Sequence, residues 1–113
     1  MLKIVSMENK MTNGKIFLSG FELDEAEKAI VGNIINNYKH KIEERADYEY
    51  IKLRLKKSRR GKAFLHEIKG SLKIDNKTFN SKVADYNLFA ATAEVMEKLM
   101  NEMIHKMRTK RQE

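Results

Sequence analysis

Three stretches in the middle of the chain alternate between apolar and polar side chains, which is the period of a β-strand with one buried face. In residues 48–57, YEYIKLRLKK, every second side chain is apolar: Ile51, Leu53 and Leu55. Residues 66–75 and 78–85 repeat the pattern, with turn-forming residues between them: Asp75, Asn76 and Lys77. Strands with one wet face are typical of antiparallel sheets. The alternation therefore predicts a sheet that buries one face under other elements.

Two longer segments have the 3.6-residue period of an amphipathic helix. Residues 21–45 place their larger apolar side chains on one helical face: Leu23, Ile30, Ile34, Tyr38 and Ile42, flanked by Val31 and Ile35. Asp24 and Glu27 have the spacing of a capping box. Residues 87–107 form a second apolar stripe: Leu88, Thr92, Val95, Leu99 and Met103, flanked by Phe89, Met96 and Met100. Asp85 or Asn87 is expected to cap this second helix.

The short apolar segment KIFLSG, residues 15–20, ends in glycine and is typical of one further strand. The predicted order is therefore β-α-β-β-β-α. Because every strand has one apolar face and both helices are amphipathic, we expect an α+β fold, a four-stranded sheet with two helices packed on one face. Residues 15–113 are expected to form a single domain. Residues 1–14 are expected to be a lead-in, either an extra strand or a loose segment.

The positive charge of the chain is concentrated in its middle third. The net charge is +7, and residues 48–84 alone hold 11 basic and three acidic residues. The run LKKSRRGKAF, residues 55–64, has five basic residues and no acid. We expect this run to be a loop that continues the polar face of the sheet. A concentrated excess of this kind is typical of a surface that binds a polyanion, and a merely solvated charged surface is the alternative.

The candidate RNA-binding residues are the cations of the polar sheet face, of this loop and of the two helices. On the strands and the loop they are Lys52, Arg54, Lys56, Lys57, Arg59, Arg60, Lys62, Lys69, Lys73 and Lys82. On the helices they are Lys28, Lys39, Lys41, Lys98 and Lys106. Glu67 is the one acid whose position in the alternation places it on the same sheet face. The sequence does not decide between contact through the sheet and contact through the helices.

Catalytic and metal-binding patterns are missing from the sequence. There is no cysteine, which excludes disulfides and thiolate ligands, and the three histidines lie on separate predicted elements: His40, His66 and His105. No glycine-rich phosphate loop follows a strand. We therefore expect no enzymatic activity, no metal, no cofactor and no small-molecule substrate. No stretch approaches the roughly 18 apolar residues of a membrane helix, and the first residues lack the apolar run of a signal peptide, so we expect a cytoplasmic protein without a membrane partner.

Several short sequences, in the right order along the chain, resemble the ribosome hibernation-promoting factor and ribosome-associated translation inhibitor family. The first strand ends in SG as the family's opening strand does, and ELDEA (22–26) is similar to the family's helix start. GSLKIDNKTFNSKVADYNLFAAT (70–92) resembles the family's hairpin and entry into the last helix, although Asn87 stands where members carry an acid. LKKSRRGK (55–62) resembles the basic loop of archaeal-looking members. The resemblance spans residues 15–108, and the chain ends before the dimerisation domain of long members, so we expect the short form.

This resemblance implies binding to the small ribosomal subunit through its rRNA. There a member blocks the decoding channel for mRNA and tRNA and so inhibits translation in idle cells. We expect a monomer. Two alternatives remain: a generic module for double-stranded or structured RNA, and a protein-interaction domain that uses the methionine-rich last helix. A double-stranded-RNA-binding domain is expected to carry lysines at the start of its last helix, where this chain has DYNLFAATAEV. An RNA-recognition motif stacks bases on aromatic side chains of its sheet, a role open here to Phe17 and Tyr50.

Overall fold

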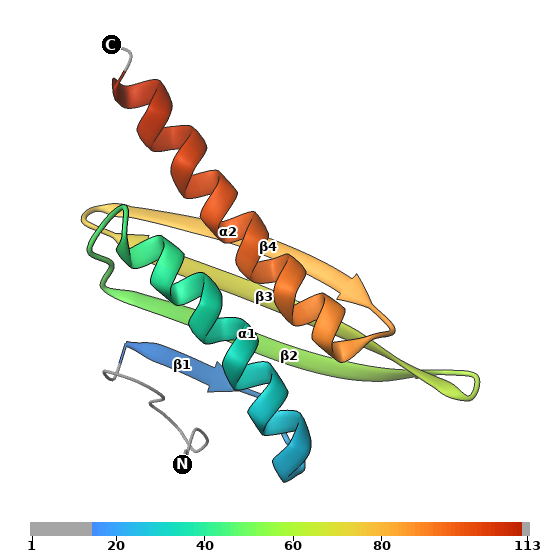
Figure 1. Ribbon diagram of the computed structural model, residues 1–113. Helices are drawn as coiled ribbons and strands as arrows, with labels where there is room; N and C mark the ends of the chain where they lie inside the picture. Colours follow the sequence, from blue (N-terminus) through green and yellow to red (C-terminus); the bar gives the residue numbers. More distant parts are fainter. Residues whose placement is uncertain (1–14, 112–113) are drawn as a thin grey trace.

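The sheet of the protein has four strands in the order β1-β2-β3-β4, and both helices lie on the same side of it (Figure 1). The computed structural model describes residues 15–111, and the side chains of residues 15–107. The elements are β1 (Ile16–Ser19), α1 (Glu25–Glu43), β2 (Tyr50–Arg60), β3 (Ala63–Ile74), β4 (Lys77–Asp85) and α2 (Leu88–Arg111). β1 pairs with β2 in parallel, and the other two pairs are antiparallel. The predicted fold class and element order are confirmed. The predicted lead-in, residues 1–14, lies outside the described residues.

The core lies between the sheet and the helices, and it consists of the side chains that the alternation selects. The strands contribute Ile16, Ile51, Leu53, Leu55, Ile68, Leu72, Phe79 and Val83, and α2 contributes Leu88, Ala91, Val95, Met96, Leu99 and Met103. α2 approaches β3 closely at Gly70, where an added Cβ would lie 2.9 Å from Leu99 Cδ1 and 3.0 Å from Val95 Cγ2. The helices begin where predicted. Asp24 and Glu27 form a capping box on α1, and the Asn87 carboxamide oxygen accepts from the Ala90 backbone N–H on α2.

The buried stripe of α1 is rotated from the predicted one. Val31, Ile35 and Ile42 are buried, whereas Ile30, predicted to lie on the apolar face, is 42% exposed. The side chain that completes the stripe is Lys39, which is buried. A lysine stem packs like an apolar side chain when its ammonium group finds a partner at the edge of the core, and hydrophobic periodicity counts lysine as polar. The sequence pattern therefore placed the centre of the face one residue too early.

The partner of Lys39 belongs to a small polar cluster where α1 ends and β2 begins. The Lys39 ammonium lies 3.2 Å from Glu43 Oε2, and the buried Tyr48 hydroxyl donates to the same oxygen at 3.4 Å. The Lys15 ammonium lies 4.9 Å from the centre of the Tyr48 ring. Burial, and then the charge and hydrogen bond of Glu43, raise the pKa of Tyr48 above its ordinary value of 10.0. The cluster thus favours the neutral phenol in the folded state.

This raised pKa predicts a loss of stability in alkali. The folded state holds the phenol proton more tightly than the unfolded chain, so its contribution is complete below about pH 10 and is lost as the pH rises further. Tyr48→Phe cannot ionise, so its urea midpoint should fall less between about pH 9 and pH 11 than that of the wild type. The control is Tyr86→Phe, because Tyr86 is 58% exposed. Parallel curves for Tyr48→Phe and the wild type would contradict the assignment.

The main difference from expectation concerns residues 55–64, predicted as a loop. They form the end of β2, a two-residue turn and the start of β3, paired without interruption to Arg60 opposite Ala63. Gly61 has a φ of 66° at the first position of the turn, as a type II′ hairpin turn requires. The resulting hairpin extends past the start of α2 and the end of β4 (Figure 1). Since neither described helix covers it, neither of its faces needs apolar residues, and the alternation that reveals a strand is lost there.

No helix in the described part of the chain is long and apolar enough to cross a membrane.

Candidate nucleic-acid interface

The face of the sheet opposite the helices is basic. The structure places six cations on this face, the ones predicted from the alternation: Lys52, Arg54, Lys56, Lys69, Lys73 and Lys82. All are exposed except Lys73, which is half-buried. We call these six residues the basic sheet face. Glu67, directly opposite Lys56, is the acid expected there.

Three of these cations form a row across the sheet. Arg54 on β2 is directly opposite Lys69 on β3, and Lys69 is directly opposite Lys82 on β4. Like charges in directly opposite positions destabilise a sheet by a few tenths to about 1 kcal/mol per pair. Within residues 15–107, no carboxylate lies within 4.0 Å of any of the three, and on the basic sheet face only Lys73 has an ion pair, at 3.9 Å from Glu49. The cationic row, Arg54–Lys69–Lys82, is thus a concentration of uncompensated charge that the fold maintains at a cost.

Neutral and aromatic groups form the next row of the sheet face, two residues along the strands from the cationic row. Lys52 lies 4.5 Å from the centre of the Tyr50 ring, and Phe17 on the edge strand is directly opposite Lys52. Phe17 is 42% exposed. On the other side of Lys52, the Ser71 hydroxyl donates to Asn80 Oδ1 at 2.8 Å. This part of the face offers ring surfaces and hydrogen-bonding groups beside the charges.

The hairpin beyond the core carries the remaining cations of the predicted loop. We call residues 56–66 the hairpin arm. Along β2, Arg60 lies on the same face as the cationic row. Lys57 and Arg59 lie on the opposite face, the one that the helices cover elsewhere in the sheet, and Lys62 lies in the turn. Because the arm extends beyond the helices, cations on both of its faces are exposed. The arm therefore presents positive charge in two directions.

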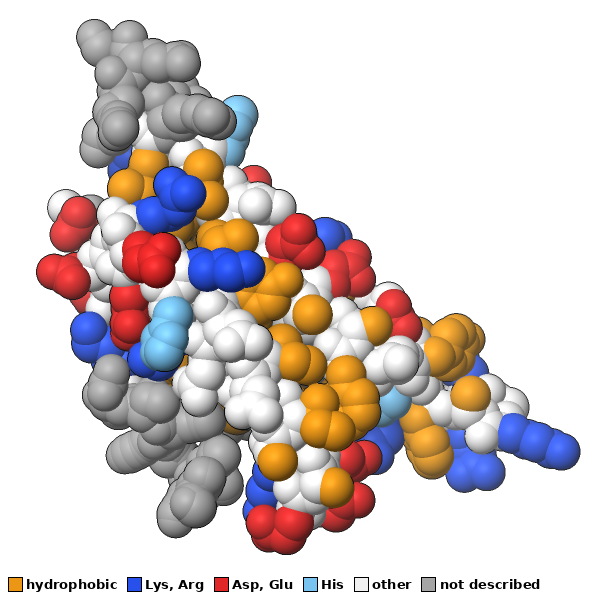
Figure 2. All heavy atoms as spheres, viewed as in Figure 1, with side chains coloured by type: hydrophobic (Ala, Val, Ile, Leu, Met, Phe, Trp, Pro, Cys, Tyr) orange, Lys and Arg blue, Asp and Glu red, His pale blue; other side chains and the backbone are white. Residues whose placement is uncertain are grey.

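The helix side of the molecule is electrostatically mixed, as Figure 2 shows, with acidic and basic side chains next to one another. The Lys28 ammonium lies 3.7 Å from Glu25 Oε2, and the Lys98 ammonium lies 3.8 Å from Glu94 Oε2. The ammonium group of Lys41 stands over the Tyr38 ring, at 5.1 Å from its centre. Lys39 is wrongly placed among the candidates, because it is buried against Glu43 and does not form part of an accessible surface. The helix side thus lacks the uniform charge of the sheet face.

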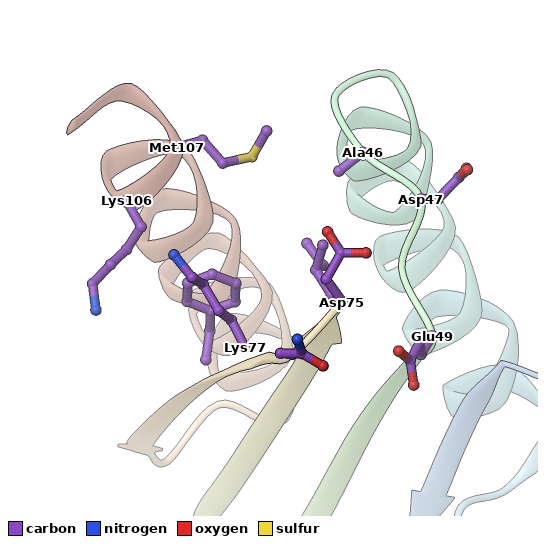
Figure 3. Close-up of a pocket in the computed structure, with 10 residues that line it drawn as sticks. Ala46, Asp47, Glu49, Asp75, Lys77, Lys106 and Met107 are labelled. Atoms are coloured by element: carbon purple, nitrogen blue, oxygen red, sulfur yellow. The ribbon is translucent and has the colours of Figure 1, made fainter. Parts of the chain in front are cut away.

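An open groove of 970 Å³ lies at the end of the molecule opposite the arm, between the α1–β2 connection, the β3–β4 turn and α2 (Figure 3). Its charged residues are Asp47, Glu49 and Asp75 on one side and Lys77 and Lys106 on the other. The candidate Lys106 therefore lines a groove at this end of the molecule, outside the basic sheet face. A groove of mixed charge is not suited to a polyanion. In the described residues no three His, Cys, Asp or Glu side chains are grouped to hold a metal ion.

No family model matches the sequence, and no curated protein matches it. Solved structures do match the fold. A ribosomal subunit interface protein from Coxiella burnetii superposes with a TM-score of 0.56 at 13% identity, over 83% of this chain and 98% of that one. The N-terminal domain of Protein Y from Thermus thermophilus gives a TM-score of 0.52 at 16% identity, over 78% and 90% of the two chains. The resemblance predicted from the sequence is therefore confirmed at the level of the fold.

Proposed function

We propose that the protein is a ribosome-associated factor that binds rRNA of the small subunit through the basic sheet face and the hairpin arm. The observation that carries the proposal is the cationic row, in which Arg54, Lys69 and Lys82 stand opposite one another with no carboxylate of residues 15–107 within 4.0 Å. Natural sheets favour opposite charges at such positions. A bound polyanion would supply the missing negative charge. The name of the Coxiella structure, a ribosomal subunit interface protein, supports the ribosome as the source of that polyanion.

The chemistry of such a surface favours recognition of the RNA backbone. Lysine and arginine contacts to phosphates release condensed counterions, which makes affinity strongly dependent on salt. Phosphate contacts fix the position of a protein without reading the base sequence. Folded RNA is recognised largely by its shape, and the domain is elongated, with extents of 50 × 31 × 19 Å. The hairpin arm at one end of this body would contact a second part of the RNA.

We further propose that this binding inhibits translation by occupying the decoding channel of the small subunit, as the sequence resemblance implies. The arm is continuous with the sheet, since it extends β2 and β3 with unbroken pairing. A folded protein in the channel would exclude mRNA and tRNA by its volume and would require no catalysis.

A cell-free translation assay tests this function. The purified protein should reduce synthesis of a reporter in an extract from the source organism. The triple variant of the cationic row, Arg54→Gln, Lys69→Gln, Lys82→Gln, should inhibit this synthesis much less. The matched control removes three cations from the helix side: Lys28→Gln, Lys41→Gln, Lys98→Gln. We expect this control to inhibit like the wild type. Equal loss of inhibition in the two triple variants would reduce the effect to net charge, and an absence of inhibition by the wild type would contradict the proposal.

A further inference from the structure

The hairpin arm carries an exposed aromatic ring in an otherwise cationic setting. Phe64, the second residue of β3, is 42% exposed. The Lys57 ammonium lies 5.2 Å from the centre of its ring and the Arg59 guanidinium 5.4 Å from it. The arm as a whole, residues 56–66, contains five Lys or Arg residues and no acid. An apolar side chain exposed at the tip of a charged hairpin contributes nothing to the core.

The arrangement around Phe64 is open on one flank. Both cations reach the ring from β2, where Arg59 is directly opposite Phe64. On the other side β4 ends at Asp85, opposite His66, so Phe64 lies beyond the last residue pair of β3 and β4. Among residues 15–111, no strand therefore flanks Phe64 on that side. Cations beside an aromatic ring with an open flank match the parts of a nucleotide, a phosphate and a flat base.

We propose that Phe64 stacks on an unpaired RNA base while Lys57 and Arg59 contact the adjoining phosphates. This rests on the proposed function and specifies its ligand at the arm: a single-stranded nucleotide rather than a duplex. In a duplex the bases are already stacked on their neighbours, whereas single-stranded RNA offers free base faces. The basic sheet face then holds the backbone of folded RNA, and the arm holds a base from a loop or an end.

Three variants test the proposal with short oligouridylate as the ligand. Phe64→Leu keeps an apolar residue but has no ring, and it should weaken binding about tenfold. Because no charge is removed, the dependence of affinity on salt should not change. The matched control is Ile30→Ala, since Ile30 is also 42% exposed but lies on α1, outside the arm and the basic sheet face. This control should bind like the wild type.

Phe64→Trp reports the stacking directly, because the chain has no tryptophan of its own. Its fluorescence should be quenched by oligouridylate and unchanged by inorganic polyphosphate, which carries charge but no base. Equal affinity of Phe64→Leu and the wild type, or equal quenching by both ligands, would overturn the proposal. Quenching by whole ribosomal subunits alone would also overturn it, since another surface would then cover the ring. If the wild-type protein binds subunits but the tests of Phe64 fail, only the stacking inference is wrong. If the wild-type protein binds neither oligouridylate nor subunits, the proposed function is wrong as well.

Discussion

Neutralising the cationic row with Arg54→Gln, Lys69→Gln, Lys82→Gln is expected to weaken binding to small ribosomal subunits by about 100-fold near physiological salt. The slope of log affinity against log salt should fall by roughly 0.7–0.9 for each contact removed. The same change should raise the stability of the fold by about 0.5–1 kcal/mol, because two directly opposed like-charge pairs disappear. Affinity and stability therefore move in opposite directions.

A loss of affinity together with a gain in stability distinguishes a binding surface from a merely solvated one. Sedimentation with subunits over a salt series gives the affinity, and urea unfolding gives the stability. The control is the triple helix-side variant of Lys28, Lys41 and Lys98, two of which already have a carboxylate within 4.0 Å. It should change both the affinity and the salt slope much less. If the variant of the cationic row binds subunits with wild-type affinity and slope, the row is not an RNA contact.

Gly20→Ala is expected to destabilise the fold by more than about 3 kcal/mol. Gly20 has a φ of 80°, and an added Cβ would overlap the carbonyl oxygen of Leu55 on β2. The positive φ alone costs about 1–2 kcal/mol for a residue with a Cβ. The clash is with backbone, so it is relieved only if the chain between β1 and α1 moves away from β2. Thermal melting should show a fall of at least about 10 °C.

Two other glycines separate the clash from the backbone strain. Gly61 has a φ of 66° but open space around its Cα, so Gly61→Ala should cost only the strain, about 1–2 kcal/mol. Gly32 lies within α1 with no atom near its missing Cβ, so Gly32→Ala should stabilise the protein by up to about 1 kcal/mol. If Gly20→Ala melts like Gly61→Ala, the close approach to β2 is wrong.

The sequence predicted the core of the sheet because each strand in it has one face exposed to solvent and one face buried. The alternation around Ile51, Leu53 and Leu55 records that asymmetry directly. It also placed the six cations on one face. The opposition of Arg54, Lys69 and Lys82 depends on strand register, which the short turns at Gly61 and Asp75 set. Parity identifies a face, but it does not identify neighbours on that face.

The features that sequence patterns missed are those in which the usual correspondence between polarity and burial fails. In the hairpin arm the end of β2 is polar on both faces, and β3 begins with three consecutive apolar residues, Ala63, Phe64 and Leu65, so neither strand shows an alternating hydrophobic period. Lys39 is a charged residue with a buried stem, so it shifted the predicted face of α1. The setting of Phe64 depends on its pairing with Arg59 across the hairpin. The turn glycine Gly61, which follows the basic end of β2, was the signal that indicated this hairpin.

Lysine footprinting on small ribosomal subunits tests the central claim most directly, because one experiment reports both association and the face that makes it. The protein is acetylated briefly with and without an excess of subunits from the source organism, and the reactivity of each lysine is measured by mass spectrometry. We expect Lys69 and Lys82 to become protected, while Lys28, Lys41 and Lys98 keep their reactivity. Protection of the helix lysines with Lys69 and Lys82 still reactive, or no protection anywhere, would contradict binding through the basic sheet face.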